Sequence, residues 1–93
     1  MADTFQCSVV TPEESVLETE AKHVNVPAHD GQIGILANHA ALLMKLGNGT
    51  LTVDLPDGSQ QQFELTGGFG QMRDNKLTLI SEKAEPVEAA AAG

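Results

Sequence analysis

The chain has 93 residues and a formal net charge of −8, from five Lys and Arg residues against thirteen Asp and Glu residues. This length fits one domain, and the acidic balance argues against nucleic-acid binding, which needs a cationic stripe to displace counterions. No apolar run approaches the ~20 residues of a membrane helix, so we expect any membrane association to be indirect. The single cysteine, Cys7, fits a reducing compartment.

Short segments in which apolar and polar residues alternate recur along the chain. Successive side chains of a strand point to opposite faces, so each segment predicts a strand with one buried face and one solvated face. Strands that follow one another this closely, without helical segments between them, favour an antiparallel sandwich or barrel. The segments lie at residues 5–9, 23–26, 50–55, 62–66 and 76–79.

Turn-forming residues separate these segments. The pairs Asn48-Gly49 and Asp57-Gly58 predict hairpins, and Asp74-Asn75 and the Thr11-Pro12-Glu13 corner predict turns. The pair Gly67-Gly68 marks a bulge, a sharp bend or a close approach of two backbones.

Two stretches do not alternate. Residues 38–45 hold a capping residue and good helix formers, so local rules leave a short helix and an extended segment open. The apolar run within them, residues 40–44, fits either a core strand or an exposed recognition face. From Glu82 onwards only Val87 is a large apolar residue, so we expect a frayed end, with a domain over residues 1–85 and a flexible Ala-rich tail over 86–93.

Few residues suggest chemistry. Cys7 alternates with buried-type residues and is expected to be an inert thiol, and the carboxylates of residues 13–14 and 18–20 are expected to be solvated. The three histidines have no common zinc spacing, and neither a nucleophile elbow nor a phosphate loop occurs. For His39, a hydrogen-bonded edge residue and a partner-facing residue both remain open. We therefore expect no catalytic residue, no metal, no cofactor and no small-molecule substrate.

The order of features resembles the ε subunit family of F-type ATP synthases, called δ in mitochondria. The resemblance is carried by "FQCSVVTPEESVLETEAKHVNVPAHDGQIGILANHAALL" and "FELTGGFGQMRDNKLTLISEKAE". It implies an all-β fold, a flattened antiparallel β-sandwich of about ten short strands, with residues 38–45 extended rather than helical. Asn38 and Ala41 stand where the family usually has Gly and Pro, and Asn still tolerates left-handed backbone.

The resemblance also implies a function. Family members are non-catalytic subunits of the rotor stalk, which link the γ subunit to the c-ring and couple ion-driven rotation to ATP synthesis, at the cytoplasmic face of the bacterial inner membrane or its organelle equivalent. Many continue into a helical hairpin that inhibits ATP hydrolysis or binds ATP; this sequence has no counterpart, so neither property is carried over. A free-standing β-sandwich binding module unrelated to ATP synthase is the alternative.

By position in the family, two sets of residues are expected to meet these partners. The set implied to face the c-ring is His29, Asp30, Gly31 and Gln32. The set implied to face the γ subunit is Thr11, His39, Ala40, Ala41, Leu42, Leu43 and Met44.

Overall fold

The computed structural model describes residues 3–87 and contains ten β-strands in two five-stranded sheets. Within this range, no helix is long and apolar enough to cross a membrane. The strands are β1 (Phe5–Val10), β2 (Ser15–Ala21), β3 (His23–Ala28), β4 (Gly31–Leu36), β5 (Leu42–Lys45), β6 (Gly49–Asp54), β7 (Gln60–Thr66), β8 (Phe69–Arg73), β9 (Lys76–Ile80) and β10 (Lys83–Val87).

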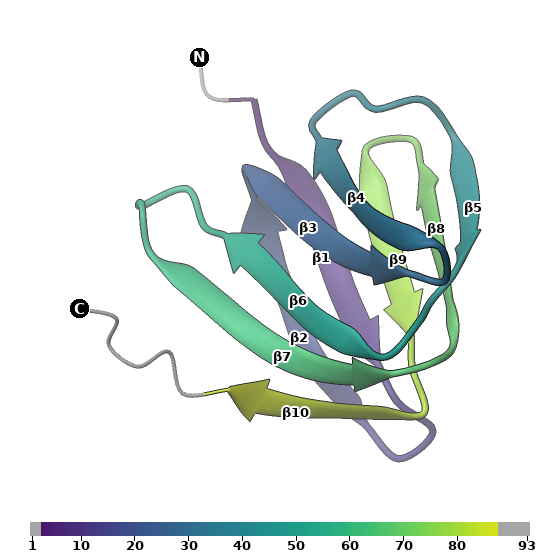
Figure 1. Cartoon of the computed structure of the whole chain (residues 1–93). Coiled ribbons are helices and arrows are strands. Elements are labelled where there is room, and N and C mark those ends of the chain that lie inside the picture. The colour runs from purple at the N-terminus through teal and green to yellow at the C-terminus, as the bar shows by residue number, and fades with distance from the viewer. Residues whose placement is uncertain (1–2, 88–93) are drawn as a thin grey trace.

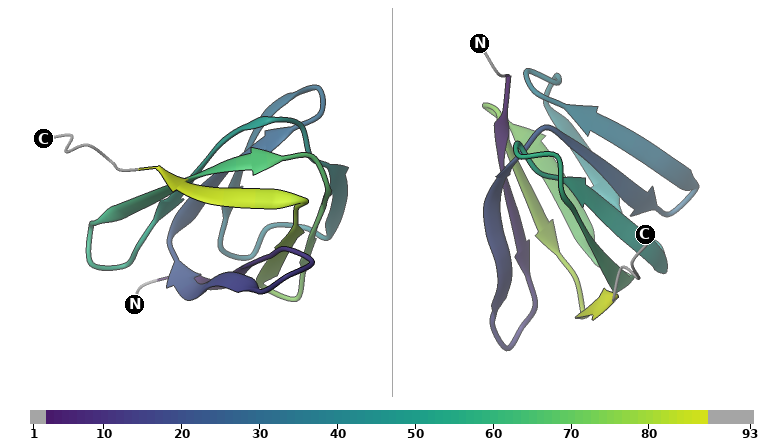
Figure 2. Two further views of the ribbon diagram at one scale, coloured as in Figure 1. Left: turned by 90° about the horizontal axis from the view of Figure 1, so that it is seen from below. Right: turned by 90° about the vertical axis from the view of Figure 1, so that its left-hand side faces the viewer.

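The sheets have the strand orders β2-β1-β9-β8-β5 and β10-β7-β6-β3-β4 and pack face to face (Figures 1 and 2). The expected all-β sandwich of about ten strands is confirmed. Pairing is antiparallel except between β1 and β9, which run parallel with Cys7 opposite Leu77. These two strands are far apart in sequence and no short turn joins them, so hairpin geometry does not impose an antiparallel direction on them.

The core lies between the sheets and is built by the period-two pattern. Apolar residues of one phase face inward from both sheets, while the other phase meets solvent. The core members are Phe5, Cys7, Val9, Ala21, Val24, Val26, Ile35, Met44, Leu46, Leu51, Val53, Phe63, Leu65, Met72, Leu77 and Leu79.

Most of the expected turns are present. Gly58 has a φ of 93° in the β6–β7 turn, and Asp74 and Asn75 have φ of 52° and 62° in the β8–β9 turn. The hairpin expected at Asn48-Gly49 is wrong, because β5 belongs to one sheet and β6 to the other. Gly49 serves close packing instead: a Cβ there would lie 3.0 Å from Cβ of Pro27.

Two neighbouring segments carry the chain from one sheet to the other. At Gly68, between β7 and β8, a Cβ would collide with the carbonyl oxygen of Ile80, so the close backbone approach is confirmed. Ser81, between β9 and β10, is buried, and its Oγ donates to the carbonyl oxygen of Lys83 at 2.7 Å and accepts from the N–H of Thr66 at 3.2 Å.

Residues 38–45 turn at Asn38 (φ 64°) and then extend into β5, as the family resemblance implied. The frayed end expected from Glu82 is wrong for β10, which pairs with β7 along its length and packs Ala84 against the core. Pro86 is tolerated there because β10 is an edge strand, where one N–H side needs no partner. The rest of the predicted tail, residues 88–93, lies outside the described residues.

Candidate functional site

Leu43 and Met44, which belong to one apolar run in the sequence, point to opposite faces of the sheet in β5. Leu43 is 72% exposed on the outer face of its sheet, whereas Met44 is 7% exposed and belongs to the core. Leu42 is half-buried and also packs against the core. Both possibilities left open for the apolar run therefore occur, one in each phase of the strand. The expectation that Met44 faces a partner is corrected, since its side chain points between the sheets.

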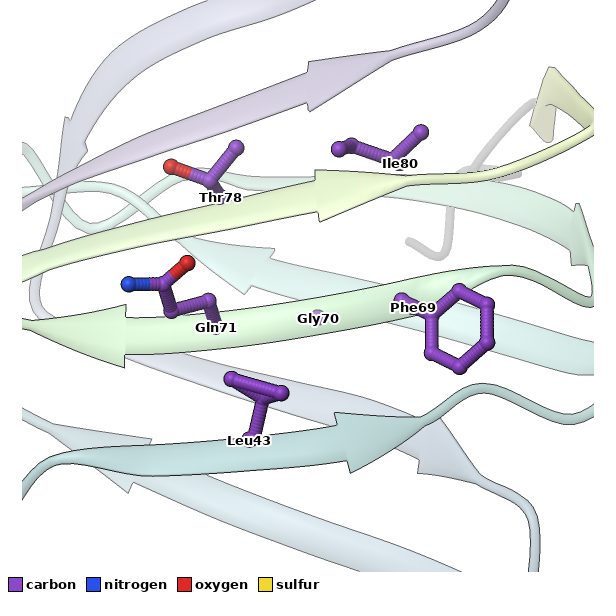
Figure 3. Close-up of a pocket in the computed structure, with 6 residues that line it drawn as sticks. All are labelled: Leu43, Phe69, Gly70, Gln71, Thr78 and Ile80. Atoms are coloured by element: carbon purple, nitrogen blue, oxygen red, sulfur yellow. The ribbon is translucent and has the colours of Figure 1, made fainter.

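Leu43 forms an exposed apolar patch with two residues from neighbouring strands. Phe69 is 60% exposed and Ile80 is 55% exposed. Phe69 lies opposite Ile80 across β8 and β9, and Leu43 lies opposite Gln71 across β5 and β8. Together with Gln71 and Thr78 they line a shallow hollow on the outer face of the sheet (Figure 3). We call Leu43, Phe69 and Ile80 the apolar patch; adjoining exposed apolar side chains make this face a candidate interaction surface.

Tight packing beneath the patch holds it in place. Gly70 faces inward on β8, and a Cβ there would lie 2.7 Å from Cδ2 of Leu79 and 3.1 Å from Cγ of Met44. The missing side chain lets these two core residues close under β8. The strand is therefore supported from within, and Phe69 in the opposite phase projects outward.

The other residues implied to face γ are divided between two ends of the sheet. His39, Ala40 and Ala41 lead into β5, and Nδ1 of His39 lies 2.8 Å from the carbonyl oxygen of Ala40, so this histidine is a hydrogen-bonded edge residue. Thr11 is buried at the end of β1, where its N–H donates to the carbonyl oxygen of Glu14. Strands β9 and β8 separate β1 from β5, so the structure does not bring Thr11 beside β5.

The residues implied to face the c-ring form the tip of the β3–β4 hairpin. His29 and Asp30 are exposed in the turn, and Gly31 has a φ of 135° that favours glycine. The side-chain amide of Asn25 donates to Oε1 of Gln32 at 2.9 Å. The structure thus brings all four predicted residues together on one polar tip.

Across residues 3–87, no three His, Cys, Asp or Glu side chains gather closely enough to hold a metal ion. Burial raises the pKa of the Cys7 thiol to about 12, which keeps it protonated and unreactive. Nδ1 of His23 lies 3.4 Å from Oδ2 of Asp54, in a half-exposed pair on the outer face of the other sheet.

Phe69 and Ile80 were missed because each lies outside the apolar run around Leu43. The alternation pattern could have identified them, because each lies in the solvated phase of its strand: Phe69 shares its phase with Gln71, and Ile80 shares its phase with Thr78. Exposed apolar side chains point to a contact surface only where several adjoin, as they do on the consecutive strands β8 and β9.

The family model, the relatives and the solved structures that match this chain all belong to ATP synthases. A family model described as the beta-sandwich domain of the ATP synthase Delta/Epsilon chain matches residues 4–87. The ATP synthase epsilon chain of Desulfitobacterium hafniense (strain DSM 10664 / DCB-2) is 41% identical over 88 residues, covering 95% of this chain and 66% of the relative. That of Paracoccus denitrificans (strain Pd 1222) is 35% identical over 86 residues, covering 92% of this chain and 58% of the relative. The chain therefore spans less than two thirds of the length of these two relatives.

Solved structures share the fold. A chain of the Euglena gracilis mitochondrial ATP synthase, in a structure described as OSCP/F1/c-ring, superposes with a TM-score of 0.85 at 22% identity, covering 90% of this chain and 54% of that one. A chain of the Tetrahymena thermophila mitochondrial ATP synthase, from a structure described as central stalk/c-ring, gives 0.69 at 19% identity, with coverage of 85% and 63%.

Proposed function

Because the chain belongs to the ATP synthase delta/epsilon family through its β-sandwich domain, we propose that it is a non-catalytic subunit of the central stalk of an F-type ATP synthase. In this role it links the γ subunit to the c-ring, so that rotation driven by ion flow through the ring reaches the sites of ATP synthesis. The relatives named epsilon chain and the fold shared with a chain of a central stalk/c-ring structure support this proposal. Membership of the family does not fit the alternative of a module unrelated to ATP synthase.

The observation that carries the proposal is the apolar patch. Leu43, Phe69 and Ile80 come from three strands of a tightly packed sheet and lie in solvent, with polar Gln71 and Thr78 beside them. An apolar centre with a polar surround is the usual composition of a durable protein interface. We assign this face, together with residues 39–41, to contact with γ.

The β3–β4 tip is assigned to the c-ring. Its exposed residues, His29, Asp30, Gly31 and Gln32, are polar or lack a side chain, which suits contact with polar loops. The N–H of His29 donates to the carbonyl oxygen of Lys45 at 2.7 Å, so the tip is fixed to the end of β5. A load received by the tip is thereby passed to the strand that carries Leu43.

The proposal places the chain outside the lipid, at the membrane face that carries the catalytic head; in bacteria this is the cytoplasmic face of the inner membrane. It is held there by its protein partners.

Affinity purification of the tagged chain from its source cell tests the proposal. We expect γ and c subunits to be recovered with it. Leu43→Asp should lose γ, because a carboxylate would have to be desolvated within an apolar contact. Leu36→Asp is the matched control, since Leu36 is 58% exposed on the outer side of β4 in the other sheet. Recovery of neither subunit with the wild-type chain would refute the proposal.

A further inference from the structure

The charges of this acidic chain are distributed unevenly over its surface. Strands β5, β8 and β9 hold Lys45, Arg73 and Lys76 and contain no Asp or Glu. They carry three of the five cationic side chains of a protein with thirteen carboxylates. Surface lysines commonly protect the edge strand of a sheet from pairing with another chain. This can explain Lys45, which lies on the edge strand β5, but not Arg73 and Lys76, because β8 and β9 are interior strands.

The cations lie on the same outer face as the apolar patch. In the strand register, Arg73 lies opposite Lys76 across β8 and β9, and Lys45 lies opposite Phe69 across β5 and β8. Gln71 and Thr78 line both the hollow of the apolar patch and a second hollow bounded by Arg73, Asp74 and Lys76, so the surface is continuous. At about 3.3 Å per residue, the four steps from Phe69 to Arg73 span about 13 Å.

We propose that this face recognises an acidic segment of its protein partner. The segment places apolar side chains over Leu43, Phe69 and Ile80 and carboxylates against Arg73 and Lys76, which lie about 13 Å along the strands from Phe69 and Ile80. The inference rests on the proposed function and adds to it the chemistry of the γ surface. Charge complementarity supports it. The rest of this acidic chain would attract a basic surface, whereas the cations of β5, β8 and β9 would attract an acidic one.

One carboxylate of the chain itself lies at the cationic end. Oδ2 of Asp74 is 3.6 Å from Nε of Arg73, and both side chains are largely exposed. Such an exposed pair is weak, so a partner carboxylate can share or replace it. Lys76, on the neighbouring strand, forms no ion pair in the structure of residues 3–87 and is available.

The test is the dissociation constant of the purified chain for the γ subunit of the same synthase, measured at low and high NaCl concentration. The double variant R73E/K76E reverses the two charges at the proposed contact. The control K22E/K83E makes the same change of net charge, with Lys22 at the β2–β3 junction and Lys83 on β10 of the other sheet. We expect R73E/K76E to bind γ at least about tenfold more weakly than the control at low salt. The difference should shrink as salt screens it.

The outcomes separate the two proposals. If the two double variants bind γ within about threefold of each other at low salt, the acidic-segment inference is overturned while the assignment to γ stands. If Leu43→Asp binds as well as Leu36→Asp, the assignment of this face to γ fails, and the acidic-segment inference fails with it. If the wild-type chain does not bind γ, the proposed function fails as well. The milder pair R73Q/K76Q and K22Q/K83Q, checked by thermal melting, gives the same comparison should the Glu variants unfold.

Discussion

Leu43 and Met44 are consecutive residues of β5, yet one side chain is 72% exposed and the other 7%. The two Asp substitutions should therefore have opposite effects. Met44→Asp buries an unpaired carboxylate and is expected to reduce the free energy of unfolding by about 3 kcal/mol or more. Leu43→Asp is expected to change it by about 0.5 kcal/mol at most. Urea unfolding followed by circular dichroism measures both, and equal losses would contradict this placement of the side chains.

Gly68 should tolerate no side chain. In Gly68→Ala the new Cβ would collide with the backbone of Ile80, so the corner between β7 and β8 must open. We expect a loss of about 3 kcal/mol or more in unfolding free energy. Gly58→Ala is the control: it has a similarly positive φ with open space around it, and should lose only about 1 kcal/mol from backbone strain. Similar melting temperatures for the two variants would argue against the close contact.

The buried thiol predicts an alkaline loss of stability. Burial raises the pKa of Cys7 from 9.0 to about 12. Between these values the unfolded chain has released the proton and the folded chain has not, so the unfolding free energy falls as the pH rises. The slope contributed by this group is about 1.4 kcal/mol per pH unit well above 9.0. Cys7→Ala, which shares every other titrating group, should show a shallower decline in urea titrations across this range. Parallel curves for the two proteins would count against the shift.

The β3–β4 tip can be tested by cross-linking. Because Cys7 is buried and protonated, Asp30→Cys should provide the one readily reactive thiol of the folded chain. A maleimide with a photoreactive arm, attached there in the assembled synthase, is expected to yield a product containing the c subunit. Asp57→Cys, in the β6–β7 turn, is the control, because the pairing of His23 with Asp54 puts that turn at the opposite end of β3. A c-subunit product from Asp57→Cys alone would reverse the assignment of the tip.

The turns illustrate how far sequence patterns reach. Asp57-Gly58 and Asp74-Asn75 were predicted correctly because each joins strands that pair with each other. Asn48-Gly49 has the same local composition but lies where the chain passes from one sheet to the other. A turn propensity is a property of a few residues, whereas the strand that follows is positioned by contacts with distant parts of the chain. β10 likewise forms by pairing with β7 although its own residues predicted no strand.

The sequence by itself determined the fold class and the inward face of most strands. That information is local, because alternation within a strand fixes which side chains share a face. Only the tertiary structure decided that Leu43, Phe69 and Ile80 form one patch and that Arg73 and Lys76 lie at its far end. Leu43 meets Phe69 and Ile80 because β5 pairs with β8, which lies much further along the chain, whereas β8 and β9 are consecutive strands of one hairpin. The pairing of β5 is set by how the two sheets pack their core together rather than by any one strand.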